Sequence, residues 1–279
     1  MAIEYLGLSS INGPLVVLEG LQDAFYDEIV EFTIEGKQQK MGRIIELNED
    51  KAVIQVFEGT ENMSLQNTHT KLTGRPMEVA VSPDMLGRTF NGIGEPVDGL
   101  GPIVSTDRRD VNGLPLNPVK REYPRNYIRT GISAIDGLTT LIRGQKLPIF
   151  SGNGLPHDQL AAQIVKQASL GEGAEGEFAV VFGAMGVKHD VAEFFRKTFE
   201  ESGVSDHVCM FLNLANDPVV ERLITPKVAL TAAEYLAFEC NMHILVILTD
   251  MTSFAEAMRE VSSSKGEIPS RKGYPGYLS

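Results

Sequence analysis

The chain has 279 residues, 43% of them hydrophobic and 22% charged, which is enough apolar material for the core of one large or two smaller soluble domains. Its formal net charge of −12 disfavours non-specific binding to nucleic acid or to an anionic membrane, because both need a basic surface on the protein. A basic partner protein remains compatible with this charge.

Cys209 and Cys240 lie far apart and fit no metal-binding spacing, so we expect two buried, reduced thiols. The longest apolar runs, such as Ile244–Leu248, have the length of a strand and not of a membrane helix. Met1–Glu4 has neither the basic region nor the apolar core of a signal peptide. These features predict a cytoplasmic chain, or one on the cytoplasmic side of a larger assembly.

Residues 1–75 are predicted to form a small β-barrel or sandwich. Turn-forming segments such as Asn12–Pro14 and Glu35–Lys37 separate short runs that favour strands. The runs are Ile3–Leu8, Leu15–Leu18, Glu28–Thr33, Met41–Leu47 and Ala52–Phe57. Five or six strands at this spacing are typical of a barrel, whose closure removes exposed edges.

Residues 76–125 are rich in glycine and proline and show little helical pattern. A disordered linker is one interpretation of this composition. However, Met77–Val81 and Ile103–Val104 are apolar enough to pack, so we favour an ordered, turn-rich connector.

From Ile132 onward, strand and helix patterns alternate, which predicts an α/β domain with a parallel sheet covered on both faces. The strand candidates are Leu147–Phe150, Phe178–Phe182, Val208–Leu212 and Ile244–Leu248, and the helix candidates are Asp158–Leu170, Asp190–Ser202, Val219–Glu239 and Ser253–Ser262. Ligands bind such sheets at the carboxyl ends of the strands. We therefore expect Ser151–Asp158, Gly183–Lys188 and Thr249–Asp250 to meet there.

The segment Ser151–Asp158 has the position of a P-loop, between an apolar run and a helix pattern. A working loop has the sequence G-x-x-x-x-G-K-[ST], whose lysine contacts the β- and γ-phosphates. Here Ser151 and Pro156 replace the two glycines, His157 replaces the lysine, and Asp158 replaces the Ser/Thr, while Gly152, Asn153, Gly154 and Leu155 lie between them. The pattern indicates a phosphate-binding scaffold that has lost its chemistry.

The other parts of a nucleotide hydrolase are equally incomplete in this sequence. Asp250 follows the apolar run His243–Leu248 and is a candidate for the carboxylate on the metal side, although Thr249 can occupy that position and an Asp there is also a common helix cap. After Phe178–Phe182, Val187 and Lys188 stand where a catalytic glutamate would project, and we interpret Asp190 as the N-cap of the following helix. We predict no catalytic residue and no metal ligand, and we interpret His157 and His189 as loop residues that contact a neighbour.

Several motifs resemble those of the rotary ATPases. The shared features are Gly131–Asp136, Arg143–Gly152 and the glycine–proline signature Leu86–Pro102. Ser151–His157 (S-G-N-G-L-P-H), Asn213–Pro218 and Gly273–Tyr277 resemble, more specifically, the non-catalytic, regulatory B subunits of V-type/A-type ATP synthases. The resemblance covers essentially the whole chain, and the S-G-x-G-L-P-H loop is a specific signal.

The resemblance implies an N-terminal β-barrel, a RecA-like P-loop α/β domain over residues 76–279, and a later helical domain. It also implies that the chain alternates with catalytic A subunits in an A3B3 head, contacts central and peripheral stalk subunits, and helps to couple ATP synthesis or hydrolysis to the transport of H⁺ or Na⁺. No cofactor is expected to bind tightly to this chain alone, and ATP or ADP with Mg²⁺ is expected at the A/B interface. The head would lie in the cytoplasm, peripheral to the membrane.

The chain ends at Gly273–Ser279 in what resembles the middle of a domain. The later segment that carries the trans-acting arginine in this family, the last sheet strands and the helical domain have no counterpart in the sequence, so we expect a part of a longer protein. No residue here can be assigned the role of that arginine.

Two alternatives remain at this stage. One is a self-sufficient hexameric P-loop ATPase of the export-motor or helicase type, which would need an intact G-K-[ST] loop and a catalytic glutamate. The other is a structural fragment that binds no nucleotide, because Asn153 and Gly154 N–H groups alone give weak affinity for phosphate.

Overall fold

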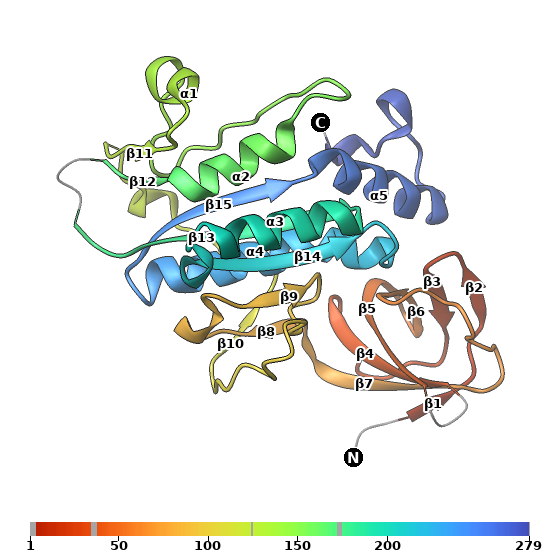
Figure 1. Ribbon diagram of the computed structural model, residues 1–279. Coiled ribbons are helices and arrows are strands. Elements are labelled where there is room, and N and C mark those ends of the chain that lie inside the picture. Colours follow the sequence, from red (N-terminus) through yellow and green to blue (C-terminus); the bar gives the residue numbers. More distant parts are fainter. Residues whose placement is uncertain (1–3, 35–37, 124, 172–174, 279) are drawn as a thin grey trace.

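The computed structural model describes residues 4–34, 38–123, 125–171 and 175–278. A β-domain formed by the N-terminal part of the chain packs beside a layered α/β domain, with the connector between them (Figure 1). Ile3 and the expected turn at Glu35–Lys37 lie outside the described residues.

The N-terminal β-barrel consists of one antiparallel sheet in the order β1-β7-β4-β5-β6-β3-β2. Its strands are β1 (Glu4–Leu6), β2 (Ser10–Asn12), β3 (Leu15–Leu18), β4 (Glu28–Ile34), β5 (Gln38–Asn48), β6 (Lys51–Val56) and β7 (Thr68–Pro76). Val30, Phe32, Ile44 and Ile54 are fully buried and form the centre of the barrel core. The five expected strands are present, whereas β2 and β7 were not predicted.

The connector is ordered wherever the structure describes it, which confirms the second of the two interpretations. It contains β8 (Glu78–Ala80), β9 (Thr89–Asn91), β10 (Arg108–Asp110) and the 3₁₀ turns Pro83–Met85 and Pro118–Lys120. β8 pairs with β10, and β9 joins the sheet of the α/β domain. Ile103 packs against the core as expected, but Val104 is 90% exposed, so the expectation that it packs was wrong.

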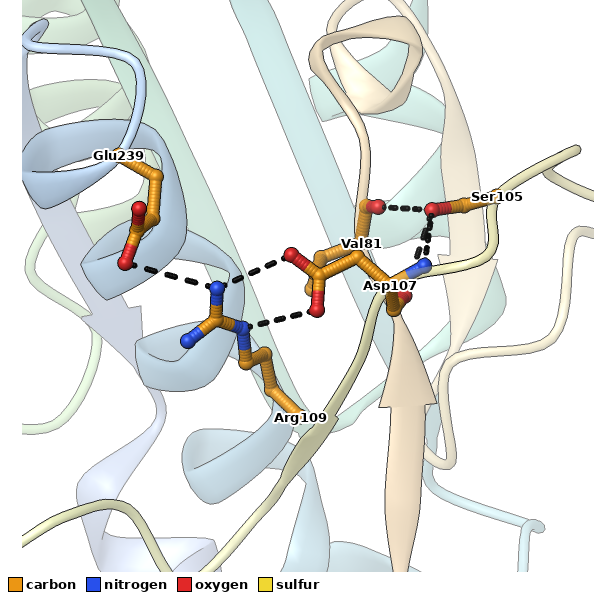
Figure 2. A network of polar contacts seen from close by, with 5 residues as sticks. All are labelled: Val81, Ser105, Asp107, Arg109 and Glu239. Carbon is orange, nitrogen blue, oxygen red and sulfur yellow. Dashed lines mark hydrogen bonds and ion pairs between the residues drawn. The ribbon is translucent and has the colours of Figure 1, made fainter.

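Figure 2 shows how polar contacts fasten the connector to the α/β domain. Ser105 Oγ donates a hydrogen bond to the Val81 carbonyl at 2.5 Å and accepts one from the Asp107 N–H at 3.0 Å. The Asp107 carboxylate accepts hydrogen bonds from Arg109 Nε at 3.1 Å and Nη2 at 2.9 Å. Arg109 Nη2 also lies 3.4 Å from Glu239 Oε1, so one guanidinium joins the connector to the end of a helix.

The α/β domain contains a parallel sheet in the order β15-β13-β14-β9, as the alternation of patterns predicts. Its strands after β9 are β13 (Phe178–Val187), β14 (Val208–Leu214) and β15 (His243–Thr249). The helices are α1 (Ser133–Leu138), α2 (His157–Gln167), α3 (His189–Glu201), α4 (Val219–Phe238) and α5 (Met251–Ser264), and the short elements are β11 (Ile128–Arg129), β12 (Ser169–Leu170) and the 3₁₀ turns Ser205–His207, Arg271–Gly273 and Gly276–Leu278.

Successive residues of the central strands point to opposite faces of this sheet, and each face is covered by helices. Val181 and Phe211 belong to the core on the α4 side, whereas Phe182 belongs to the core on the α3 side. The Phe182 ring lies 4.6 Å from the Phe195 ring and 5.5 Å from the Phe199 ring, measured between centroids. The expected apolar face of this helix, Val191, Phe194, Phe195 and Phe199, is confirmed.

The expected strand Leu147–Phe150 does not form. These residues pair with no strand among the described residues, and the side chains of Ile149 and Phe150 are 50% and 92% exposed. β15, the edge strand of the described sheet, pairs only with β13. An apolar run becomes a strand only where a neighbouring strand satisfies its backbone groups, and the described residues supply no such neighbour to this run.

Candidate functional site

The segment Ser151–Asp158 is an exposed loop that leads into α2. Gly154 has a φ of +81°, which favours glycine at this point of the turn. The helix begins at His157, after Pro156, without a hydrogen bond from a capping side chain. Within the described part of the chain, the hydrogen bonds and ion pairs of the loop stay between residues 152 and 160. The loop therefore makes no such bond to Gly183–Lys188 or Thr249–Asp250, with which it was expected to meet.

The charges at this loop do not fit a Mg²⁺–triphosphate bound as in a catalytic P-loop. The His157 ring contacts the Leu155 carbonyl through Nδ1 at 3.0 Å, and its Nε2 lies 3.6 Å from Asp158 Oδ1. No lysine or arginine lies within residues 151–158, and the Asp158 carboxylate in the first helical turn would repel phosphate oxygens. Only the free N–H groups of the helix N-terminus remain to attract an anion.

The carboxyl ends of β13 and β14 do come together, as the sheet predicts. Asn213 Oδ1 accepts hydrogen bonds from the Gly186 N–H at 3.0 Å and from Arg222 Nε at 2.8 Å. Gly186 has a φ of +65°, and a Cβ atom there would stand 2.8 Å from Arg222 Nε and 2.9 Å from Ser253 Cβ. A glycine is therefore required where the two strands and the helices α4 and α5 converge.

Asp250 is the N-cap of α5. Its Oδ1 accepts a hydrogen bond from the Thr252 N–H at 2.9 Å, and its Oδ2 accepts one from Ser253 Oγ at 3.2 Å. Thr249 is the last residue of β15 and lies opposite Ala184 in the ladder. Both carboxylate oxygens of Asp250 thus serve the helix end, which favours the capping interpretation over a metal-side role.

Asp190 is not a cap, in contrast to our interpretation of the sequence. The N-cap of α3 is Lys188, which makes no side-chain capping bond, and Asp190 is the second residue of the helix. Its Oδ1 accepts a hydrogen bond from the adjacent Val191 N–H at 3.0 Å. The helix begins two residues earlier than expected because its exposed first turn, His189–Asp190, carries no apolar periodicity that could indicate its start.

Glu221 is a buried acidic residue that sequence reasoning missed. It lies in the first turn of α4, where acidic residues are common, so its sequence position carries no special signal. Its Oε1 accepts a hydrogen bond from the Gly92 N–H at 3.0 Å, which connects the glycine-rich loop of the connector to this helix. Burial, and then the nearby charge of Asp217, raise the pKa of Glu221 to about 7.

Neither a metal centre nor a membrane span is found in the described part of the chain. No group of three or more His, Cys, Asp or Glu side chains among the described residues could hold a metal ion. Over the same residues, no helix combines the length and apolar character that crossing a bilayer requires. Cys209 and Cys240 are both free thiols, the first buried and the second half-buried, and burial raises the pKa of Cys209.

Comparison with known proteins places this geometry in a family. Residues 131–279 match the nucleotide-binding domain of the ATP synthase alpha/beta family, and residues 8–74 match its beta-barrel domain. The chain is 63% identical over 279 residues to "V-type ATP synthase beta chain 2" of Clostridium tetani, covering 100% of this chain and 61% of the relative.

Two further relatives extend the comparison. The chain is 61% identical over 275 residues to "V-type ATP synthase beta chain" of Halothermothrix orenii, and 56% identical over 275 residues to the B subunit of the A-type ATP synthase of Aeropyrum pernix. Each match covers 99% of this chain and 59% of the relative, so the chain spans about three fifths of the length of these proteins. With both domain types matched in the order in which the structure shows them, the chain belongs to the ATP synthase alpha/beta family.

Proposed function

We propose that this chain acts as a non-catalytic, regulatory B subunit in the head of a V-type/A-type ATP synthase. The relatives that match it along its whole length bear the names of such subunits or of the corresponding beta chains. In this proposal the chain comprises the barrel, residues 1–75, and the α/β domain with its connector, residues 76–279.

The observation that carries the non-catalytic role is the chemistry of Ser151–Asp158. A histidine stands where the phosphate-binding lysine is needed, and Asp158, 3.6 Å from the His157 ring, adds negative charge where phosphate oxygens would lie. Asp250 is engaged as a helix cap. This chain therefore holds none of the groups that stabilise a transferring phosphoryl group.

In the assembled head, the chain would alternate with catalytic A subunits in an A3B3 ring and contact stalk subunits. ATP or ADP with Mg²⁺ would bind at the A/B interface on the loop of A, while this chain forms the facing wall. Such a head would lie in the cytoplasm, peripheral to the membrane, and would couple ATP synthesis or hydrolysis to H⁺ or Na⁺ transport through other subunits.

A reconstitution with a catalytic A subunit tests the proposal. We expect ATP hydrolysis in the mixture to be lost when the phosphate-binding lysine of A is replaced, and to remain within about twofold when His157 of this chain is replaced by alanine. His189→Ala serves as the matched control for loss of an exposed histidine. Loss of activity in His157→Ala alone would contradict the non-catalytic role, and failure of ATP to bind the mixture would support a purely structural fragment.

A further inference from the structure

A cavity of about 270 Å³ lies between the barrel and the connector, away from the loop Ser151–Asp158. Its apolar lining comes from both sides of the junction and includes Ile29, Met41, Phe57, Met77, Val79 and Ile103. Ile29 and Phe57 belong to the barrel and Val79 to the connector strand β8, and all three lie in one buried cluster. Any molecule that fills this space would contact both parts of the protein.

The walls of the cavity are stiff, so that it is held open without a ligand. Pro76, Pro96 and Pro102 line it, and proline restricts the backbone of each segment to which it belongs. Gly94, with a φ of +87°, brings its loop so close that a Cβ atom would stand 2.9 Å from Val79 Cγ2. Phe57 and Val79 are only 1% and 3% exposed and are therefore fixed in the core behind the cavity.

The charged groups around the cavity balance one another. Arg75 and Arg108 face the carboxylates Glu78 and Glu95 in the lining, and Arg108 Nε lies 3.5 Å from Glu78 Oε2. A charged ligand would lose hydration on entry and find no net charge of opposite sign. An uncharged, apolar ligand loses little hydration and gains contact with the buried side chains.

We propose that this cavity is a binding site for one uncharged, apolar small molecule, about the size of a bicyclic aromatic compound. A dry cavity of about 150 Å³ accepts benzene, so the larger space here suits two fused rings. The bound molecule stabilises the junction of barrel and connector. This site is independent of the proposed role of the chain in an ATP synthase.

Methyl NMR of the 279-residue chain with indole as the probe tests the site directly. With ¹³C-methyl methionine, Met41 and Met77 report on the cavity, while Met185, Met210 and Met242 belong to the α/β domain and do not line it. We expect saturable shifts confined to the first two methyl groups, with a Kd on the order of 1 mM or tighter. No saturable shift up to the solubility limit of indole, or shifts only at the other methyl groups, would overturn the proposal.

Two variants and two charged probes make the test specific. Ile103→Trp fills the cavity and should weaken indole binding at least tenfold, whereas Val104→Trp adds the same ring at the adjacent exposed position and should leave binding within twofold. Indole-3-acetate and tryptamine carry a similar ring with a negative and a positive charge, and both should bind at least fivefold more weakly than indole. Equal affinity of the two variants, or tighter binding of either charged probe, would contradict the proposal.

Discussion

His157 and Asp158 occupy the two positions at which a catalytic P-loop has its lysine and its metal-binding hydroxyl. Their side chains lie 3.6 Å apart at the start of α2, so the loop pairs a ring with a carboxylate and presents no ammonium group. At the scale of single residues, the electrostatics of this loop oppose phosphoryl transfer even though a helix N-terminus is available.

Replacing Glu221 with glutamine should change how stability depends on pH. Because burial raises the pKa of Glu221 from 4.5 to about 7, the folded state binds a proton more tightly than the unfolded state, and wild-type stability falls as pH rises from about 4.5 to 7. Glutamine still accepts the Gly92 hydrogen bond and carries no charge. Glu221→Gln should therefore unfold like wild type near pH 4.5 and gain on the order of 2 kcal/mol at pH 8.

Urea denaturation at several pH values measures this difference. Glu234→Gln, which removes an exposed carboxylate from the same helix, is the control and should leave the pH dependence unchanged. A Glu221→Gln variant whose advantage does not grow between pH 4.5 and 8 would show that the buried carboxyl carries no such penalty.

Gly186→Ala should destabilise the fold by about 3 kcal/mol, because a positive φ and contact with Arg222 and Ser253 both oppose the new methyl group. Gly203→Ala provides a comparison, since Gly203 has a similar φ of +70° but no atom within 4 Å of its ideal Cβ. It should cost only about 1 kcal/mol. Equal losses in chemical denaturation would mean that the backbone conformation alone requires glycine at Gly186.

At the scale of elements, the two aspartates at helix starts should behave differently. Asp250→Ala removes the hydrogen bonds to the Thr252 N–H and Ser253 Oγ and should cost about 1 to 2 kcal/mol of stability. Asp190→Ala should cost less than about 0.5 kcal/mol, because Asp190 is exposed and lies inside α3. Thermal unfolding of the two variants checks the order, which a larger loss in Asp190→Ala would reverse.

The elements that could be predicted from sequence are those whose pattern is local. The spacing of Phe194, Phe195 and Phe199 predicts the buried face of α3, and the alternation of strands and helices predicts the parallel sheet. Leu147–Phe150 has an equally apolar pattern and forms no strand, because pairing depends on a neighbour that the run itself cannot specify.

The elements that were missed owe their form to distant partners. β9 is a three-residue strand in a glycine- and proline-rich segment, and it exists because it pairs with β14, more than a hundred residues later. β7 consists largely of polar residues and is held between β1 and β4. The loop chemistry at His157 and Asp158 was evident from sequence, whereas the burial of Glu221 depends on Gly92 from the connector, which no local pattern could indicate.

At the scale of the whole molecule, the barrel and the α/β domain share one core. Phe57 of the barrel lies in the same buried cluster as Val228 of α4, and Asn12 Nδ2 donates a hydrogen bond to the Ser264 carbonyl at the end of α5 at 3.0 Å. Phe57→Ala should therefore speed hydrogen exchange in α4 as well as in the barrel and cost about 3 to 5 kcal/mol.

Ile54→Ala is the control for this shared core, because Ile54 is fully buried in the cluster confined to the barrel. It should speed exchange in the barrel strands and leave α4 protected. Hydrogen exchange followed by mass spectrometry distinguishes the two patterns, and an unaltered α4 in Phe57→Ala would show that the two parts unfold independently.

The central claim, that the loop Ser151–Asp158 performs no phosphoryl transfer, is tested most directly by γ-phosphate release from the purified chain alone with saturating Mg²⁺ and ATP. We predict a rate that does not exceed that of buffer, in the chain and in His157→Ala alike. Turnover of about 1 s⁻¹ or faster, the range of ordinary enzymes, that disappears in His157→Ala would contradict the account.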